Sequence, residues 1–593
     1  MARNKYDVDE ELKSQFDKKY LKRVLKYVKP HKKVIIVTII LMLVSTISGL
    51  LAPYFIKIAM DDSIPNKDMV QLTILSGLLL LTTVISAFCL KQRIRAMSFV
   101  GQSIIKDIRT DIFTHLQKLP FSYYDSRPHG KILVRVVNYV NSLSDLLSNG
   151  IINLITDLFS LVFIVLFMMY LDAKLTVISL IGMPILIGGI FLIKTAHRKA
   201  YQNLSRKQSN MNAYIHESIC GVKVTQSFAR EQENMRIFRD VVDNYRQAWL
   251  HTIKIQFLLS PIVDNVSALT TAAIYICGII WLKGSVSVGV LIAFISYTSR
   301  FWAPINNLAN FYNNIVNAMA YLERIFETID EELQVENLPG ATDIPKIVGK
   351  VEFEHVSFAY DESNLILKDV NFNVEPGQSV ALVGPTGAGK TTIINLISRF
   401  YNVTEGRLLI DGHDVQMVTL ESLRGQMGVM LQDAFIFSGT IMDNIRYGKL
   451  DATDEDVIEA ARTVKAHDFI ETMKDGYYTQ VNERGSRLSA GQKQLISFAR
   501  ALLASPRILI LDEATSSIDT KTEILLQQGL ERLLKGRTSF IIAHRLSTIK
   551  NADIIMYIDD GKIAERGTHD ELMALNGLYA KLYNSQFEFL EAI

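Results

Sequence analysis

The sequence predicts two domains in series, a polytopic α-helical membrane domain followed by an α/β domain. Six long apolar runs fill the first half of the chain, and a polar stretch containing Pro and Gly follows near Glu331–Lys350. Beyond it, short β-type runs alternate with helical patterns, which is typical of an α/β fold with a largely parallel sheet. We expect a membrane domain over residues 1–330, a linker over 331–348 and the α/β domain over 349–593.

Each apolar run holds about 20 residues or more, the length that an α-helix needs to cross a hydrocarbon core of about 30 Å. Burial inside a large soluble protein is the alternative, but six such runs in about half a chain argue against it. The six expected transmembrane helices are Val34–Ile56, Val70–Leu90, Ile151–Tyr170, Leu175–Ile193, Phe257–Leu282 and Val288–Val316.

Lys and Arg residues predict the orientation, because basic connections stay on the cytoplasmic side of a membrane. The segment before the first run and the long connections after the second and fourth runs are rich in both residues. We therefore expect a multi-pass protein of the cell membrane whose two termini, long helical extensions and α/β domain are cytoplasmic. Basic and apolar residues alternate at helical spacing in Lys18–Val28, which predicts an interfacial helix over about 18–30. A solvated basic arm is the alternative.

Charge and cysteine content exclude several classes of protein. Lys+Arg 63 against Asp+Glu 61 leaves a net charge of +2, so no global basic field favours a nucleic-acid partner. The three cysteines, Cys89, Cys220 and Cys277, lie far apart and lack the spacing of a metal site or a disulfide framework.

A glycine-rich loop after the apolar strand Ser379–Val383 matches the pattern G-x-x-x-x-G-K-[ST] and opens the helical stretch Thr392–Phe400. Such a loop closes backbone N–H groups around a phosphate, and the helix N-terminus adds a favourable dipole. Lys390 should reach the β- and γ-phosphates of ATP, and the Thr391 hydroxyl should bind Mg²⁺. The expected ATP-binding residues of the loop are Gly384, Pro385, Thr386, Gly387, Ala388, Gly389, Lys390, Thr391 and Thr392.

Two carboxylates follow the apolar strand Ile508–Leu511. At such a strand end, Asp512 can hold Mg²⁺ through water and Glu513 can polarise the attacking water. Alone, this pattern would more often be a buried strand with a solvated acidic end. Together with a phosphate-binding loop upstream, it predicts nucleotide hydrolysis.

At this point the sequence resembles the ATP-binding cassette (ABC) exporters over nearly its whole length. The segment Leu488-Ser489-Ala490-Gly491-Gln492 is close to the family signature LSGGQ, which would contact the ATP of a partner chain. The resemblance implies an adenine-stacking role for Tyr360, γ-phosphate and Mg²⁺ sensing for Gln432, and a γ-phosphate contact for His544. Ser516, Ser517, Ile518 and Asp519 match the family's loop that follows the catalytic carboxylate, here Glu513.

The resemblance implies a dimer, since ATP in this family lies between one chain's phosphate loop and the other chain's signature. Ala490 and Asn482 stand where the family commonly has Gly, and neither change removes a phosphate ligand. Because Glu513 and His544 are both present, a homodimer is favoured, with a heterodimer as the alternative. Phe121–Ser126 and Asn212–Cys220 resemble the two coupling regions and should dock near Gln432.

The substrate is expected to meet polar residues of the sixth run. Its asparagines follow helical spacing, so most of them share one face. Charges inside membrane runs are candidate functional residues, and the depths of Arg300, Asp157 and Asp264 nearly coincide, which suggests that Arg300 is paired with one of the two carboxylates. Three separately held charges are the alternative. The cavity candidates are Arg300, Asn306, Asn310, Asn313, Asn314, Asn317, Asp157 and Asp264.

We conclude from the sequence that the chain is a half-transporter, an ATPase coupled to export or flipping of a small amphipathic substrate, drug-like or lipid-like. Alternatives of the same fold are a peptide exporter with a leader peptidase, for which the N-terminus is short, and an ATP-gated channel or regulatory subunit. A stand-alone soluble ATPase conflicts with the six apolar runs.

Overall fold

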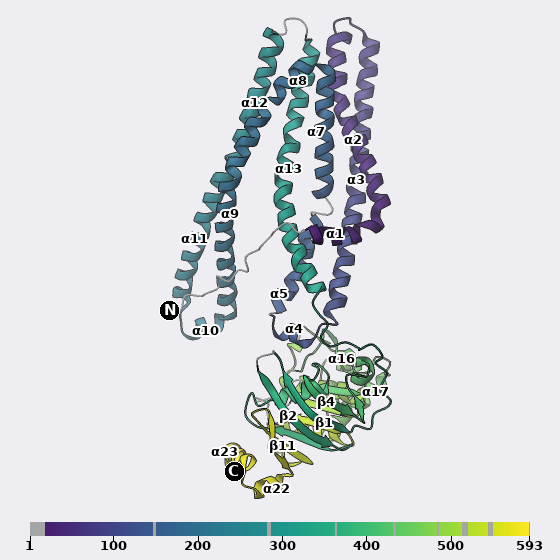
Figure 1. Cartoon of the computed structure of the whole chain (residues 1–593), viewed down its shortest axis with the longest axis vertical. Coiled ribbons are helices and arrows are strands. Elements are labelled where there is room, and N and C mark those ends of the chain that lie inside the picture. Colours follow the sequence, from purple (N-terminus) through teal and green to yellow (C-terminus); the bar gives the residue numbers. More distant parts are fainter. Residues whose placement is uncertain are drawn as a thin grey trace. The chain divides into compact units, whose positions relative to one another are not determined.

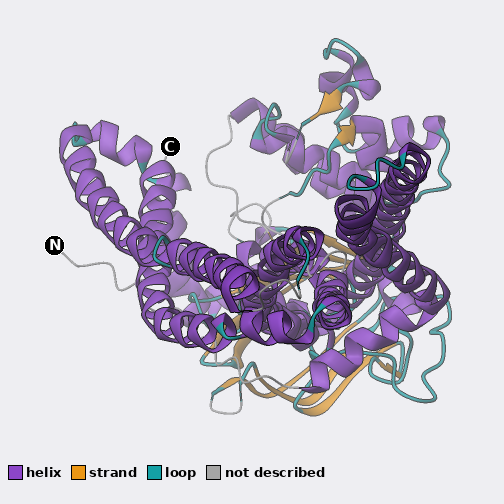
Figure 2. Cartoon of the chain, turned by 90° about the horizontal axis from the view of Figure 1, so that it is seen from above, coloured by secondary structure: helices purple, strands orange, loops and turns teal. Residues whose placement is uncertain are grey.

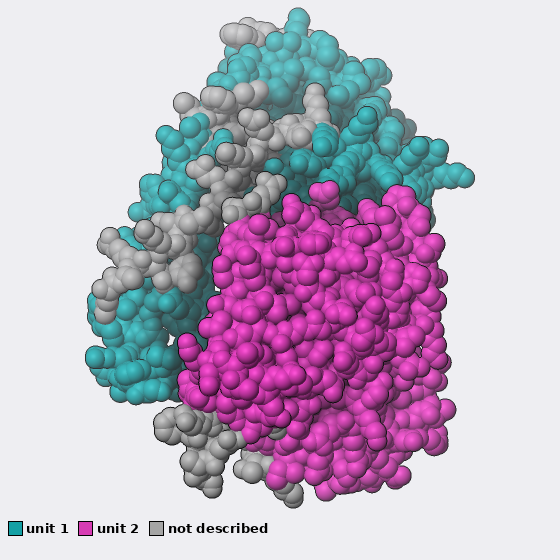
Figure 3. All heavy atoms as spheres, turned by 60° about the horizontal axis from the view of Figure 1, so that its bottom comes forward, with its two compact units in different colours: residues 1–116, 130–330 teal, residues 117–129, 331–593 magenta. Residues whose placement is uncertain are grey.

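A computed structural model describes residues 18–591, except 128, 146–149, 282–285, 362–363, 431–433, 483–484, 513–519 and 544–548. The chain forms two compact units, which are coloured separately in Figure 3. Residues 1–116 and 130–330 form the membrane unit, and residues 117–129 and 331–593 form the α/β unit. The segment 117–129 therefore groups with the α/β unit, although it lies within the first half of the chain.

The membrane unit is helical (Figures 1 and 2). Its longest helix has 48 residues, or about 72 Å at the helical rise, and thus extends well beyond a hydrocarbon core of about 30 Å. The helices are α1 Lys18–Val28, α2 Lys32–Ile58, α3 Met69–Leu116, α5 His129–Val134, α6 Val140–Asp145, α7 Ile151–Leu171, α8 Ala173–Leu180, α9 Gly182–Cys220, α10 Val222–Ser227, α11 Glu231–Gln256, α12 Leu259–Ile276 and α13 Val288–Ile329.

Four helical segments of the described residues are long and apolar enough to cross a membrane: Lys22–Ser63, Met69–Leu116, Asn153–Leu171 and Val288–Ile305. The other two expected spans contain the shorter apolar helices Ala173–Ile185 and Asp264–Ile280. The fourth expected span is divided between α8 and α9, since α9 begins at Gly182 with Pro184 in its first turn, a position where proline favours a new helix.

Helix α13 packs against α2, α7 and α12 in the membrane unit (Figure 1). Buried apolar residues from these helices form one cluster, which includes Leu50 of α2, Ile164 of α7, Ile274 of α12 and Phe294 of α13. At the other end of α13, α1 is fixed by side chains rather than left as a solvated arm. The Tyr20 and Phe326 rings stack at 6.0 Å, and Arg23 pairs with Asp330.

The α/β unit contains a six-stranded sheet in the order β12-β11-β3-β10-β9-β6 and a four-stranded antiparallel sheet in the order β2-β1-β4-β5. Strands β11, β3, β10, β9 and β6 of the larger sheet are parallel, so their carboxyl ends share one edge. The strands are β1 Val351–Ala359, β2 Leu365–Val374, β3 Ser379–Val383, β4 Glu405–Ile410, β5 His413–Asp414, β6 Met427–Met430, β7 Gly439–Thr440, β8 Gln480–Val481, β9 Ile508–Asp512, β10 Thr538–Ile542, β11 Ile554–Asp559 and β12 Lys562–Gly567.

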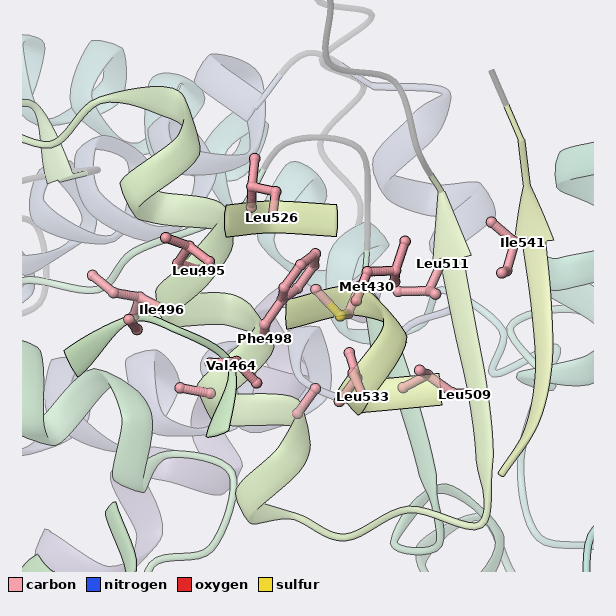
Figure 4. Packing of buried hydrophobic residues seen from close by; sticks show 14 of the residues in the cluster. Met430, Val464, Leu495, Ile496, Phe498, Leu509, Leu511, Leu526, Leu533 and Ile541 are labelled. Carbon is pink, nitrogen blue, oxygen red and sulfur yellow. The ribbon is translucent and has the colours of Figure 1, made fainter. Parts of the chain in front are cut away.

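Helices cover this sheet and complete its core. Figure 4 shows apolar side chains of β6, β9 and β10, among them Met430, Leu509 and Ile541, packed near Leu495 and Phe498 of α19. The helices are α4 Phe121–Asp125, α14 Lys390–Ile397, α15 Leu420–Arg424, α16 Ile441–Arg446, α17 Asp454–Thr463, α18 His467–Glu471, α19 Ala490–Leu503, α20 Thr520–Leu534, α22 His569–Ala574 and α23 Leu578–Glu591.

Residues 331–348, which the sequence suggests are a linker, belong to the α/β unit. Ile344 and Ile347 are buried in its core, and the backbone N–H groups of Val348 and Lys350 donate to the Asp411 carboxylate. This segment is therefore fastened to the fold by apolar contacts and hydrogen bonds rather than held only at its ends.

Candidate nucleotide site

The phosphate-binding loop predicted from the sequence joins β3 to α14. Gly384 has φ +138°, and a Cβ atom there would lie 2.1 Å from the Ile558 carbonyl oxygen. Gly389 caps α14 with φ +109°, and a Cβ atom there would lie 2.7 Å from the Leu367 side chain. Only glycine fits these two positions, so the backbone can turn tightly at the N-terminus of α14, where N–H groups favour an anion.

Lys390 begins α14 and folds back over this loop. Its Nζ donates to the carbonyl oxygens of Gly384 at 2.7 Å and Pro385 at 2.8 Å. Burial lowers the pKa of Lys390, and the nearby Asp512 carboxylate at the end of β9 opposes that shift. The loop therefore brings an ammonium group, the exposed Thr391 and a carboxylate to one edge of the sheet. Pro385, Thr386, Gly387 and Ala388 form the turn between β3 and α14.

Tyr360, the residue expected to stack on adenine, lies directly after β1. Its hydroxyl is 3.2 Å from the hydroxyl of buried Thr392 in α14, and Asn395 donates to it at 3.4 Å. The residue remains 48% exposed, and its ring packs edge-on against Phe358 and Tyr401 at 4.9 and 5.0 Å. The hydroxyl is thus fixed beside the phosphate loop while part of the ring is open to a base.

The predicted catalytic residues Gln432, Glu513 and His544 lie outside the described residues, as do Ser516, Ser517, Ile518 and Asp519 of the loop after Glu513. The described strands end close to these positions in the chain: β6 ends at Met430, β9 at Asp512 and β10 at Ile542. Strand β10 lies between β3 and β9 in the sheet.

The predicted signature forms the start of α19. Ser489 is the N-cap, accepting from the Gln492 N–H at 3.2 Å, while Gln492 Oε1 accepts from the Ser489 N–H at 3.0 Å. This reciprocal pair is a capping box. Leu488 and Gly491 are buried, and Ala490 is exposed, so its methyl group meets no steric conflict within this chain.

Helix α4, which contains most of the first predicted coupling region, belongs to the α/β unit and contacts the residues that closely follow the phosphate-loop helix α14. The rings of Phe121 and Phe400 are 4.3 Å apart, and the Tyr401 hydroxyl donates to Asp125 Oδ2 at 3.0 Å. Burial and this hydrogen bond raise the pKa of Tyr401, which keeps its donor proton in place. Since Tyr401 also contacts Tyr360, one aromatic contact separates the expected adenine-binding ring from α4.

The second predicted coupling region, Asn212–Cys220, ends α9 in the membrane unit. Its described contacts include α11, where Tyr214 donates to the Asn234 carbonyl oxygen at 3.1 Å and stacks on Phe238. Docking of this region on an α/β unit stays a prediction.

Two arginines of the α/β unit, buried Arg399 and half-buried Arg500, were not predicted as structural donors from the sequence. Arg399 is 0% exposed, and its guanidinium donates to the carbonyl oxygens of Val418, Glu336 and Gln416. Arg500 of α19 similarly donates to backbone oxygens at Phe435 and Asn444. An arginine directly after the apolar run TIINLIS was the available signal for Arg399, but its three partners are remote in sequence.

Arg300 and Asp157 make contacts in the membrane unit other than a pairing with each other. Arg300 Nη1 donates to the Gly49 carbonyl oxygen at 2.7 Å, and Asn307 lies 3.4 Å from Asp157 Oδ1. Within this chain Arg300 is therefore held by a backbone carbonyl rather than by Asp157, because α2 brings an acceptor directly to it. Pairing with Asp264, or across a dimer, stays a prediction. Positions 306, 310, 313, 314 and 317 lie on the continuous helix α13, but their side chains lie outside the described residues.

Comparison with known proteins agrees over both units. A profile described as the ABC transporter transmembrane region matches residues 35–305, and a profile described as ABC transporter matches 367–516. An uncharacterized ABC transporter ATP-binding protein of Bacillus subtilis is 43% identical, over 98% of this chain and 97% of the relative. An ATP-dependent lipid A-core flippase of Syntrophus aciditrophicus is 36% identical, over 96% and 94%. A fatty acid ABC transporter ATP-binding/permease protein of Mycobacterium bovis is 38% identical, over 82% and 77%.

A solved structure gives the same answer for the fold. A bacterial Atm1-family ABC exporter with ATP bound superimposes with a TM-score of 0.78 at 29% identity, covering 94% of this chain and 98% of that one. The arrangement of phosphate loop, signature helix and helical membrane unit on one chain thus has close counterparts in proteins of known type. The chain belongs to the ABC transporter family, as an exporter that fuses a transmembrane region to an ATPase domain coupled to transport.

Proposed function

We propose that two copies of this chain form an ATP-driven exporter that moves a small amphipathic substrate, drug-like or lipid-like, out of the cytoplasmic leaflet or the cytoplasm. The contact of α4 with Phe400 and Tyr401 carries the proposal, because α4 comes next after the membrane-unit helix α3 in the chain and these two residues closely follow the helix that begins at Lys390. A movement of the phosphate loop on ATP binding would therefore be transmitted through this contact to α4. Both termini and the ATPase domain are cytoplasmic in this proposal.

The hydrolytic roles follow from chemistry at the carboxyl edge of the parallel strands. Lys390 binds the β- and γ-phosphates, Tyr360 stacks on adenine, and Glu513 orients and deprotonates the attacking water. Gln432 and His544 contact the γ-phosphate. Oxygen donors at Thr391, Asp512 and Gln432 suit Mg²⁺, which would neutralise phosphate charge when bound. Asp512 supports this assignment, since its carboxylate is near enough to Lys390 to raise the pKa of that ammonium group against the effect of burial.

A dimer is needed because the signature residues Leu488–Gln492 of one chain would close over the phosphate loop of the other. In a variant without native cysteines, Ser489→Cys on one chain and Gly387→Cys on the other should cross-link only when ATP is trapped. Cross-linking to the same extent with and without trapped ATP would contradict ATP-driven closure. A chain that stays monomeric and inactive alone would favour a heterodimer instead.

The nature of the relatives supports an amphipathic substrate. Proteins similar to this chain include one named a lipid A-core flippase and one named a fatty acid transporter. In this chain, the face of α13 that carries positions 306, 310, 313, 314 and 317 would supply amide groups to a wet cavity.

Substrate-stimulated ATPase in proteoliposomes tests the proposal, with Glu513→Gln as the matched control. The amide keeps the shape of the side chain but cannot act as a base, so this variant should bind ATP, hydrolyse it far more slowly and stop transport. Near-normal turnover by Glu513→Gln would reject the role of Glu513. Ion currents without ATP turnover in the unaltered chain would favour a channel.

A further inference from the structure

A proline in the first transmembrane helix leaves a backbone acceptor open inside the membrane unit. Pro53 lies within α2 and has no N–H group, so the carbonyl oxygen of Gly49, four residues earlier, has no helical donor. An unpaired carbonyl at membrane depth is strongly unfavourable. The structure supplies a donor from α13: Arg300 Nη1 lies 2.7 Å from the Gly49 oxygen. The adjacent Leu50 oxygen accepts from the Tyr297 hydroxyl at 2.6 Å.

Arg300 is thereby held at one point while most of its guanidinium stays open. A guanidinium has five N–H donors, and the Gly49 oxygen takes one of them. The residue is exposed in this chain, as are Ser299, Ala303 and Asn307. Spacings of three and four residues place Arg300, Ala303 and Asn307 on one side of α13, which we call the open face. The buried residues Phe294, Tyr297 and Phe301 lie on the side that packs on neighbouring helices.

The composition of the open face fits a wet cavity rather than lipid. A charged or amide side chain directed into hydrocarbon is costly, so such groups face a bundle interior or water. Among the described residues, no ion pair includes Arg300. Asp157 accepts from Asn307 and interacts electrostatically with Arg93. The Arg300 guanidinium thus holds a positive charge within the membrane span and keeps N–H donors available for a ligand.

We propose that Arg300, positioned by the Gly49 carbonyl that Pro53 leaves open, binds the headgroup of an anionic amphiphile, either a carboxylate or a phosphate. This inference rests on the proposed export function and specifies its substrate class. Guanidinium binds carboxylate and phosphate through parallel charge-assisted hydrogen bonds, which are stronger away from bulk water. An apolar chain is part of the ligand because Arg300 lies within the apolar span Val288–Ile305, where a free anion would lack any complement.

The test measures binding and ATPase stimulation for the full-length chain in nanodiscs of zwitterionic lipid, with empty nanodiscs as the blank. Dodecyl phosphate, dodecyltrimethylammonium and inorganic phosphate are the probes. We expect the unaltered chain to bind dodecyl phosphate about tenfold or more tightly than the cationic probe, and inorganic phosphate to compete weakly. Arg300→Gln should abolish this preference, and Arg300→Lys should retain part of it.

A second variant separates binding from folding. Pro53→Ala restores an N–H group that can donate to the Gly49 oxygen, so α2 no longer needs Arg300 as a donor. Arg300→Gln should therefore lower the thermal unfolding midpoint more in the native background than in the Pro53→Ala background. In both backgrounds it should remove the preference for dodecyl phosphate.

Four outcomes would overturn the inference. The preference could survive Arg300→Gln in the Pro53→Ala background, or inorganic phosphate could compete as well as dodecyl phosphate. Equal stimulation by the anionic and cationic probes in the unaltered chain would also reject it, while leaving export intact. Dissociation of the dimer by Arg300→Gln with an unchanged preference would assign the guanidinium to the chain–chain interface. By contrast, a lack of stimulation by any amphiphile would reject the proposed export function itself.

Discussion

The two units satisfy their polar groups in different ways. In the α/β unit, Ser489 and Gln492 cap α19 three residues apart, and Lys390 bonds to carbonyls five and six residues away. In the membrane unit, Arg300 and Gly49 are 251 positions apart, and Asn307 and Asp157 are 150 apart. These polar contacts of the ATP site therefore form within short sequence motifs, whereas those of Arg300 and Asp157 depend on how helices distant in sequence pack.

The largest effect is expected from a change in the most local of these features. Lys390→Ala removes the ammonium that lies over the phosphate loop, so ATP should bind roughly tenfold or more weakly, and hydrolysis should fall by about 10²-fold or more. Nucleotide binding and steady-state ATPase measure the two effects. Lys368→Ala is the control, since the Lys368 side chain makes a surface ion pair with Asp560. Unchanged ATP affinity of Lys390→Ala would undo the assignment of the site.

The same difference explains which features could be predicted from sequence. The phosphate loop and the signature helix were predictable because their backbone geometry and caps are set by neighbours in the chain, as at Gly384, Gly389 and Ser489. The apolar runs predicted helices because length and hydropathy suffice for that. Helix α4 was expected only as part of a coupling region that docks near Gln432, since its contact with Phe400 depends on tertiary packing.

The contact between Arg300 and Gly49 shows what the sequence alone leaves open. Depth estimates along the helices suggested a carboxylate, but depth along one axis says nothing about which face of a neighbouring helix is near. Pro53 was visible in the sequence. Because proline has no N–H group, it was the available signal that the Gly49 carbonyl oxygen lacks a helical donor. Choosing Arg300 as the donor required the packing of α13 against α2.

A long-range polar contact inside the α/β unit tests whether the contrast belongs to the membrane or to sequence separation. Arg399→Leu would leave the carbonyl oxygens of Val418, Glu336 and Gln416 without this donor. We expect the free energy of unfolding to fall by about 3 kcal/mol. Chemical denaturation of the full chain, followed by a signal from the α/β unit, measures this change.

The control for Arg399 is Arg407→Leu, because Arg407 makes an exposed ion pair with Glu354, for which a change below about 1 kcal/mol is expected. Equal effects of the two substitutions would show that burial of the Arg399 guanidinium contributes nothing special.

A smaller effect, on ATPase activity, is expected at the contact between Tyr401 and α4. Tyr401→Phe removes the hydrogen bond to Asp125 but keeps the ring against Tyr360. Loss of one such bond, worth about 1 kcal/mol, should lower substrate-stimulated ATPase roughly fivefold while ATP affinity stays unchanged. Tyr478→Phe is the matched control, since it removes an exposed hydrogen bond to Asp454 in the same unit. If both variants behave alike, or if ATP affinity falls with Tyr401→Phe, the contact does not transmit coupling.

The smallest effect on folding is expected at Ser489, and it separates a structural role from a nucleotide role. Ser489→Ala removes the N-cap of α19, which should lower the unfolding free energy by about 1 kcal/mol. Thr440→Ala removes an equivalent capping box at α16 and should cost a similar amount. If Ser489 also binds the partner chain's ATP, its substitution alone should slow hydrolysis in the dimer, because α16 contains no signature residue. Equal ATPase rates in the two variants at equal loss of stability would mean that Ser489 acts only as a cap.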